Sequence, residues 1–257
     1  MITSAQNPKI QRLRALFSQR KAREESGEAP LEGVRLVEDA LAAGWQPRQV
    51  FFTAGLSPRG MELAERCRAQ GAEVEEVDPR LLKAALDTEN PQGLAAVFAL
   101  RSLDFPARPD FLVVADGLRD PGNLGTLLRT AEAAGAQGLL LAPGTVEAFS
   151  PKVLRAGMGA HFRLPILPLD WAELERRLKP DLRVYLADAA EGRDYCDLDM
   201  RLPLALVIGG EAEGVSPQAR RLADGFARIP MPGRAESLNA AVAAGVLLFE
   251  VVRQRRG

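Results

Sequence analysis

Polar side chains gather in three segments of the second half of the chain, each directly after an apolar run. The first segment, residues 116–134, reads DGLRDPGNLGTLLRTAEAA and places Asn123 in a turn that opens a helix. The apolar positions of this helix form one stripe, which leaves Arg129 on the opposite side. Unpaired N–H groups at a helix start can receive polar ligand atoms. The pattern indicates a ligand-binding turn, although a plain turn followed by a solvated arginine fits the same residues.

The second segment is a glycine-rich loop that follows a strand. Residues 206–216 read LVIGGEAEGVS, so Gly209 and Gly210 allow a ligand to approach the backbone closely. The carboxylate of Glu211 can accept hydrogen bonds there. The spacing matches neither the dinucleotide fingerprint nor a P-loop, which disfavours a dehydrogenase. A tight turn between strand and helix is the alternative interpretation.

The third segment, residues 229–249, reads IPMPGRAESLNAAVAAGVLLF. A strand ends at Ile229, and Ser237 is a suitable N-cap for a helix that is apolar on nearly every side. Such a helix is buried, so Asn239 in its first turn needs a hydrogen-bond partner. All three segments follow strand ends, where parallel α/β sheets bind their ligands.

Composition restricts the chemistry further. The 257 residues include one histidine, His161, and two cysteines, Cys67 and Cys196, so a zinc cluster is excluded and no metal is expected. The start of the chain lacks an apolar signal segment, and no apolar run reaches the ~20 residues of a membrane span. We therefore expect a cytoplasmic protein with no membrane partner, whose chemistry uses Arg, Ser, Asn, Asp or Glu.

Charge is balanced in total but segregated along the chain. Lys and Arg number 33 against 34 Asp and Glu, which by itself argues against a nucleic-acid partner. However, residues 1–23 carry six cations and no acid. No ion-pair partner exists within that segment, so a solvated helix face and an RNA-contacting surface both remain possible interpretations.

The elements that position these residues form two α/β series separated by a proline-containing linker. The predicted domains are residues 1–100, the linker 101–110, and residues 111–257. Near-continuous apolar strands in the second series predict a mainly parallel sheet covered on both faces. Its strands are predicted at 111–115, 138–142, 164–167, 183–187, 204–208 and 226–229, and its helices near 123–134, 150–158, 171–178, 216–223 and 237–253.

Three ordered motifs resemble the SpoU (TrmH) family of RNA 2′-O-ribose methyltransferases, within the SPOUT superfamily. The motifs are Asp120-Pro121-x-Asn123-x-Gly125-x-x-x-Arg129-Thr130-Ala131, Gly209-Gly210-Glu211-x-x-Gly214 and Ile229-Pro230-Met231-x-Gly233-x-x-x-Ser237-Leu238-Asn239. The front of the chain resembles the family's L30e-like RNA-binding domain, through Ser4-x-x-Asn7-Pro8 and Glu32-Gly33-x-Arg35-x-Val37.

The resemblance implies a fold, a cofactor and an assembly. It implies an N-terminal L30e-like α/β domain, and a C-terminal SPOUT α/β domain with a deep trefoil knot. It also implies a homodimer formed through the C-terminal domain, and methyl transfer from S-adenosylmethionine (AdoMet) to a ribose 2′-hydroxyl. The implied cofactor-binding residues are Gly209, Gly210, Ile229, Met231 and Leu238, and the implied catalytic residues are Arg129, Asn123, Glu211, Ser237 and Asn239.

The role of Arg129 has two possible readings. Arginine stays protonated in proteins, so Arg129 is expected to hold the target phosphate and to stabilise developing alkoxide charge. The alternative is that a desolvated site lets it act transiently as a base.

By analogy with family members that carry a separate front domain, the RNA is expected to be ribosomal (23S) rather than transfer RNA. A tRNA 2′-O-methyltransferase and a non-catalytic RNA-binding dimer are the alternatives. With few aromatic residues, RNA recognition should depend on phosphate contacts and on RNA shape. The predicted RNA-binding residues are Lys9, Arg12, Arg20, Lys21, Arg23 and Arg35.

Overall fold

The computed structural model describes residues 1–86, 88, 91–211 and 214–256. The chain divides into two compact units. The first consists of Met1–Arg101 together with Phe149–Phe162, and the second of Ser102–Ala148 together with Arg163–Gly257. The segment 149–162, which the sequence places in the second domain, therefore packs with the first unit.

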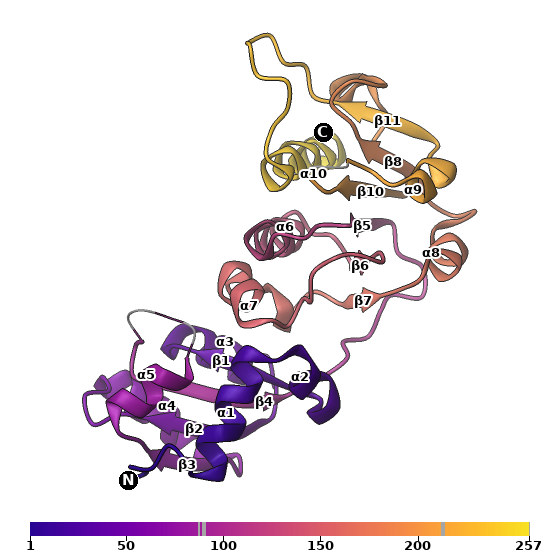
Figure 1. Cartoon of the computed structure of the whole chain (residues 1–257). Coiled ribbons are helices and arrows are strands. Elements are labelled where there is room, and N and C mark those ends of the chain that lie inside the picture. The colour runs from indigo at the N-terminus through magenta and orange to yellow at the C-terminus, as the bar shows by residue number, and fades with distance from the viewer. Residues whose placement is uncertain (87, 89–90, 212–213, 257) are drawn as a thin grey trace. The chain divides into compact units, whose positions relative to one another are not determined.

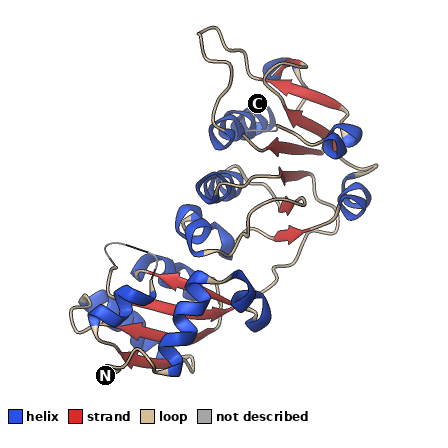
Figure 2. Cartoon of the chain, in the orientation of Figure 1, coloured by secondary structure: helices blue, strands red, loops and turns tan. Residues whose placement is uncertain are grey.

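The first unit contains a four-stranded sheet with helices on both faces (Figures 1 and 2). The strand order is β1-β4-β2-β3, in which β4 is antiparallel to both neighbours and β2 and β3 are parallel. The strands are β1 (Glu28–Glu32), β2 (Pro47–Phe52), β3 (Glu73–Glu76) and β4 (Leu94–Ala99). The helices are α1 (Pro8–Ser18), α2 (Arg20–Ser26), α3 (Val34–Ala42), α4 (Pro58–Ala69), α5 (Pro79–Ala85) and α7 (Pro151–Gly157), followed by the short helical turn η1 (Ala160–Phe162).

Alternating side chains of this sheet supply two separate cores. Val50 belongs to the core shared with α3 and α4, whereas its neighbour Phe51 belongs to the core shared with α1 and α5. This alternation follows from the two-residue period of a strand. Both faces of the sheet are therefore buried.

Aromatic contacts explain why residues 149–162 belong to the first unit. The ring of Trp45 lies 6.1 Å from that of Phe149 and 5.1 Å from that of Phe162, measured between centroids. Leu154 of α7 is fully buried in the same core. Burial of these large side chains stabilises the segment on the first unit.

The second unit contains a seven-stranded sheet in the order β7-β6-β5-β10-β8-β11-β9, and all its pairs are parallel. This confirms the predicted mainly parallel sheet. The strands are β5 (Phe111–Asp116), β6 (Leu139–Leu141), β7 (Ile166–Pro168), β8 (Arg183–Ala187), β9 (Arg193–Asp194), β10 (Leu204–Gly209) and β11 (Gly225–Arg228). The helices are α6 (Pro121–Ala133), α8 (Trp171–Leu178), α9 (Pro217–Leu222) and α10 (Ala240–Arg256), with the helical turn η2 (Tyr195–Asp197).

Several elements differ from the sequence prediction. The structure adds the two-residue strand β9 to the predicted second series. β1 contains Pro30 and lies at the edge of its sheet, where the missing N–H of proline is tolerated. α10 begins at Ala240 rather than at Ser237, because Asn239 caps it, as described below.

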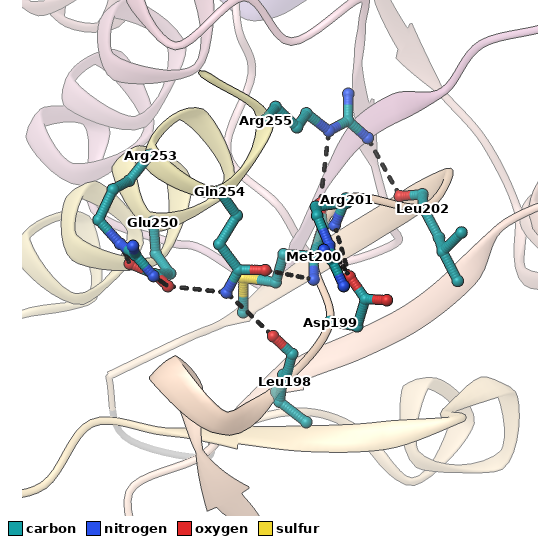
Figure 3. Close-up of polar contacts among 9 residues, drawn as sticks. All are labelled: Leu198, Asp199, Met200, Arg201, Leu202, Glu250, Arg253, Gln254 and Arg255. Atoms are coloured by element: carbon teal, nitrogen blue, oxygen red, sulfur yellow. Dashed lines mark hydrogen bonds and ion pairs between the residues drawn. The ribbon is translucent and has the colours of Figure 1, made fainter. Parts of the chain in front are cut away.

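Polar contacts hold the C-terminal end of α10 to the preceding segment 198–202 (Figure 3). The side chain of Gln254 donates to the carbonyl of Leu198 and accepts from the N–H of Met200, both at 2.9 Å. Arg255 donates to the carbonyl of Leu202 at 3.1 Å and to that of Met200 at 3.4 Å. α10 is therefore anchored at its far end, while its first turn reaches the candidate site.

Candidate active site

Two neighbouring strands of the parallel sheet end at the same level and carry the first two motif loops. Gly209, at the end of β10, lies in register with Asp116, at the end of β5. The buried carboxylate of Asp116 accepts a 2.6 Å hydrogen bond from the N–H of Ser216. This bond ties the end of β5 to the start of α9 and closes the glycine loop against the sheet.

Three of the predicted catalytic residues meet in one hydrogen-bonded cluster. The amide of Asn123, in the first turn of α6, donates to Glu211 Oε1 at 2.6 Å. The amide of Asn239 donates to the same oxygen at 2.7 Å and to Asn123 Oδ1 at 2.9 Å. Residues from three distant parts of the sequence therefore converge on a single carboxylate oxygen, and we call them the Asn–Glu–Asn cluster.

Helix caps orient the two asparagines. Asp120 caps α6 by accepting a 2.8 Å bond from the N–H of Asn123. Asn239 caps α10, because its Oδ1 accepts from the N–H groups of Ala241 at 3.0 Å and Val242 at 3.2 Å. The N-cap of α10 is therefore Asn239 and not Ser237, since the carbonyl oxygen of the Asn239 side chain fills that role while its amide nitrogen faces the cluster.

A cavity of about 440 Å³ adjoins the cluster. Its lining includes all five predicted cofactor-binding residues, which are Gly209, Gly210, Ile229, Met231 and Leu238. Glu211, Ser237 and Asn239 also line it, and Leu247 and Ile208 add apolar surface. All five predicted cofactor-binding residues therefore line one cavity together with three of the predicted catalytic residues. A fourth, Asn123, contacts two of those three.

Close packing explains the two glycines in the wall. A Cβ atom on Gly209 would lie 2.4 Å from the backbone carbon of Gly214, and a Cβ on Gly210 would lie 2.8 Å from the carbonyl oxygen of Gly117. A larger residue at position 209 would therefore displace backbone. Glycine here allows the loop to fold tightly beside the cavity.

Asp188 is a cavity-lining residue that the sequence analysis missed. Burial by itself raises the pKa of its carboxyl. Hydrogen bonds from the N–H groups of Ala190 and Glu191, and from Arg220 at 2.7 Å, outweigh burial and hold that pKa below its ordinary value. Its position directly after the strand 183–187 was the signal that could have identified it.

A second cavity of about 370 Å³ shares Gly210, Glu211, Gly214 and Val215 with the first. Asp120 and Asn123, at the start of α6, line it as well. The Asn–Glu–Asn cluster therefore borders both cavities, and Glu211 contributes to the wall of each.

Arg129 is not brought to this cluster. It lies on an exposed stripe of α6, lines neither cavity, and has no hydrogen-bond or ion-pair partner within the described part of the chain. It lies six positions after Asn123, which places the two side chains on different faces of the helix. Its guanidinium is available to a ligand or to another chain.

Acids outside residues 1–23 neutralise two of the predicted RNA-binding cations. Lys9 pairs with Glu73 at 3.0 Å and with Glu75 at 2.5 Å, and the hydrogen bond to Glu75 is the main cause that raises the pKa of Lys9. Arg12 pairs with Glu28 at 2.5 Å. The lack of acids within the segment therefore does not make a free basic surface, because the sheet provides the partners.

Three further cations lie in α2. Arg20 and Lys21 each pair with a glutamate four residues further along the helix, at 2.6 and 3.6 Å. Arg23 is only 5% exposed and donates to the carbonyl of Leu16 at the end of α1. The prediction that Arg23 contacts RNA is therefore corrected, since a buried guanidinium that joins two helices cannot reach a phosphate. Arg35 remains exposed.

The described ranges contain no group of three or more His, Cys, Asp or Glu side chains that could hold a metal ion. No helix among them is long and apolar enough to cross a membrane.

Comparisons with known proteins match both parts of the chain. Residues 110–249 match the SpoU rRNA Methylase family, and residues 7–96 match the MRM3-like substrate binding domain. The mitochondrial rRNA methyltransferase 3A of Danio rerio is 38% identical over 96% of this chain and 68% of its own length. The 23S rRNA (guanosine(2553)-2′-O)-methyltransferase of Bacillus subtilis is 31% identical over 97% of this chain and 98% of its own.

Two solved structures are similar to this chain over nearly its whole length. An AdoMet-bound rRNA methyltransferase from Sinorhizobium meliloti is 36% identical, with a TM-score of 0.88 over 98% of this chain and 97% of that one. The SpoU methyltransferase AviRb from Streptomyces viridochromogenes, solved with AdoMet, is 34% identical, with a TM-score of 0.87 over 98% and 99%. The motifs, the parallel sheet and these matches together show that the chain belongs to the SpoU rRNA methylase family.

Proposed function

We propose that this chain transfers a methyl group from AdoMet to a ribose 2′-hydroxyl of RNA, and that the RNA is 23S ribosomal RNA. One observation carries the proposal: the five predicted cofactor-binding residues line one cavity, and that cavity meets the Asn–Glu–Asn cluster. The names of relatives support ribosomal RNA, since the Bacillus subtilis and Streptomyces viridochromogenes proteins are 23S rRNA 2′-O-methyltransferases. Because these two relatives are bacterial, we keep the cytoplasm as the proposed compartment.

The first cavity fits AdoMet. Ile229 and Leu247 provide apolar surface for an adenine ring, and Gly209 and Gly210 contribute backbone to the cavity wall. The carboxylate of Asp188 at its edge can accept hydrogen bonds or pair with a cationic group. When bound, AdoMet supplies the electrophilic methyl group, and the protein residues provide binding and orientation.

The second cavity is our candidate site for the target nucleotide. It opens at the N-terminus of α6 and is lined by Asp120, Asn123 and Glu211. Because Glu211 also lines the first cavity, a nucleotide bound in the second is adjacent to the cofactor. Holding two reactants in line can contribute about 7–11 kcal/mol to the lowering of a barrier. The two asparagines fix Glu211 and thereby the wall that both ligands would share.

Arg129 completes this proposal as the group that contacts phosphate and stabilises developing negative charge. It lies outside both cavities of its own chain, so it would act at the site of a second copy. A homodimer fits this position. Thr130, the residue after Arg129, packs on Gly245 of α10, next to the exposed apolar side chains of Val242 and Phe249.

The direct test is methyl transfer to defined RNAs. The purified chain is incubated with methyl-labelled AdoMet and with 23S rRNA, 16S rRNA or tRNA, and the RNA is digested to nucleosides. We expect label in a single 2′-O-methylnucleoside from 23S rRNA. Label in tRNA would instead identify tRNA, the alternative substrate, as the RNA that is methylated. Calorimetric AdoMet binding with no label in any RNA would instead support a non-catalytic RNA-binding dimer.

A further inference from the structure

The proposed methyl transfer releases a proton, and the commonest proton acceptor is absent from the second unit. A ribose 2′-hydroxyl loses its proton when its oxygen takes up the methyl group. Histidine is the most frequent base in enzymes, but the one histidine of the sequence, His161, is buried in the first unit. Arg129 stays protonated and cannot accept a proton. The acceptor must therefore be another group at the place where the two ligands meet.

Glu211 is the one ionisable residue, among those that the structure describes, that lines both cavities. The other three shared residues are Gly210, Gly214 and Val215. The methyl group would come from the first cavity and the hydroxyl from the second. The attacking oxygen would therefore lie at the shared wall, where Glu211 supplies a carboxylate.

The other carboxylates of the two cavities are placed less favourably. Asp188 lines the first cavity but not the second, and its two oxygens already accept hydrogen bonds from two backbone N–H groups and from Arg220. Asp116 and Asp120 line the second cavity but not the first. Asp116 is buried and bonded to the start of α9, and Asp120 caps α6. These three carboxylates therefore have structural partners and lie away from the shared wall.

The two oxygens of Glu211 have unequal surroundings. Oε1 accepts both amide donors of the cluster, from Asn123 at 2.6 Å and from Asn239 at 2.7 Å. Oε2 has no hydrogen-bond or ion-pair partner within the ranges that the structure describes. Because Glu211 is exposed, a ligand can reach it. The cluster therefore fixes the carboxylate through one oxygen and leaves the other available to a donor.

A carboxylate is basic enough to take this proton. As the ribose oxygen bonds to the methyl carbon it gains positive charge, so its O–H becomes strongly acidic and a weak base suffices. Carboxylates are generally ionised near neutral pH. An ionised base held within reach of the hydroxyl is what general base catalysis requires.

We propose that Glu211 accepts the proton of the ribose 2′-hydroxyl through Oε2. The O–H bond breaks as the bond between the ribose oxygen and the methyl carbon forms, and the electron pair of the broken sulfur–carbon bond remains on sulfur. The proton moves to Oε2 and leaves later to water. Asn123 and Asn239 act as positioning residues, because they hold Oε1. This inference rests on the proposed function and assigns the acceptor of its proton.

Single-turnover methyl transfer to 23S rRNA tests this step. Glu211→Gln keeps a carbonyl oxygen that can accept from the two amides but loses the basic oxygen. Its rate should fall by about 10²-fold or more, because general base catalysis contributes about 10²–10⁴-fold. Glu211→Asp keeps a carboxylate and should recover part of the rate. Glu236→Gln, at an exposed position that lines neither cavity, is the control and should transfer at the rate of the unmodified chain.

The pH dependence of the rate distinguishes a proton acceptor from a structural carboxylate. Between about pH 8 and about pH 4 the rate of the unmodified chain should fall toward acid, because a protonated carboxyl cannot accept the proton. In Glu211→Gln the part of this fall that is due to Glu211 should be absent. The other charged groups of the two cavities are present in both chains, so any dependence that they cause is common to the two. They are Asp116, Arg119, Asp120 and Asp188.

Three measurements without methyl transfer check the same assignment. Calorimetry should give Glu211→Gln the AdoMet Kd of the unmodified chain, because cofactor binding needs no proton acceptor. Thermal unfolding checks that each variant is folded. Carbon-13 NMR of the chain labelled at its glutamate carboxyl carbons follows the protonation of Glu211, whose resonance is the one that Glu211→Gln lacks. Its titration midpoint should coincide with the midpoint of the pH–rate profile.

The outcomes separate this role from the proposed function. Transfer by Glu211→Gln at the rate of the unmodified chain, or the same fall toward acid in both chains, overturns the role of Glu211 and leaves the proposed function intact. A titration midpoint that differs from the midpoint of the pH–rate profile also overturns it. An unmodified chain that labels no RNA contradicts the proposed function, and the role of Glu211 fails with it.

Discussion

At the residue scale, Asn239 performs two tasks with the two ends of one amide. Its Oδ1 caps α10, and its Nδ2 donates to Glu211 and Asn123. Variants that keep the acceptor of this side chain but remove its amide donor, or that remove both, should therefore change helix stability and site geometry to different extents.

Substitution of Asn239 by Ser and by Ala separates these tasks. Asn239→Ser keeps an acceptor for the cap but loses the amide donor, so stability should be nearly unchanged while methyl transfer falls by about 10–100-fold. Asn239→Ala loses both, and its unfolding free energy should also fall by about 1 kcal/mol. Denaturant unfolding and single-turnover transfer measure the two effects. Equal stability of the two variants would contradict the cap assignment.

Arg129 should affect catalysis and not stability, because its side chain is exposed and has no partner among the described residues. Arg129→Ala should change the unfolding free energy by less than about 0.5 kcal/mol and reduce methyl transfer by about 10²–10³-fold. Arg129→Lys keeps a charge without the planar fork and should restore only part of the activity. The control is Arg66→Ala, another exposed helical arginine. Near-complete activity of Arg129→Lys would show that bidentate contact is not required.

At the scale of elements, the loop after β10 depends on a glycine that no other residue can replace without moving backbone. Gly209→Ala would place a Cβ 2.4 Å from the backbone of Gly214, so the wall of the first cavity, where we propose that AdoMet binds, would shift. We expect the Kd for AdoMet to rise about tenfold or more in calorimetry. Gly55→Ala, where a Cβ meets no atom within 4 Å, is the control and should leave the Kd unchanged.

The far end of α10 should make stability depend on pH. Glu250 is 7% exposed and accepts two bonds from Arg253, at 2.7 and 2.8 Å. The hydrogen bond from Arg253 is the main cause that lowers the pKa of Glu250 below its ordinary 4.5, against the opposing effect of burial. A carboxyl with a lowered folded-state pKa stabilises the fold above its unfolded pKa, and this stabilisation is lost as pH falls through the folded value.

Glu250→Gln should therefore be less stable than the unmodified chain near neutral pH. The difference between the two should shrink as the pH falls below the ordinary pKa of 4.5. Denaturant unfolding measured from about pH 7 to about pH 3 checks this expectation. Glu62→Gln, at an exposed helical position, is the control. A difference that stays constant across this range would show that the ion pair with Arg253 has no part in the acid sensitivity.

At the scale of the whole molecule, the proposed homodimer accounts for apolar side chains left in solvent. Val242 is 54% and Phe249 is 49% exposed, and their spacing of seven residues places them on one face of α10. Val242→Glu should convert a dimer to a monomer of 27.8 kDa in light scattering and abolish methyl transfer. Leu202→Ser changes another exposed apolar residue and is the control; its mass in light scattering should remain that of the dimer. A monomeric unmodified chain would refute this assembly.

The trefoil knot stays a prediction of the family resemblance. The strand order β7-β6-β5-β10-β8-β11-β9 requires crossovers between non-consecutive strands. Neither hydrophobic periodicity nor strand order can show whether one segment passes through a loop formed by another, and true knots are rare among folds.

The sequence by itself determined the local elements and the chemical identity of the site. Strand 183–187 and helix 171–178 have the predicted bounds, because a continuous apolar run and a capped amphipathic pattern are local signals. The loops at 123, 209–211 and 229–239 were predicted to bind ligand, because they follow strands that end together. The family resemblance of the three motifs then indicated which of their residues would meet around one cavity.

Tertiary structure decided what depends on partners distant in the sequence. It showed that Glu73, Glu75 and Glu28 neutralise Lys9 and Arg12, so an acid-free segment was not a free cationic surface. It also placed residues 149–162 with the first unit and left Arg129 away from the cluster. Burial and ion pairing arise between elements that the chain brings together only when folded, and no local pattern encodes them.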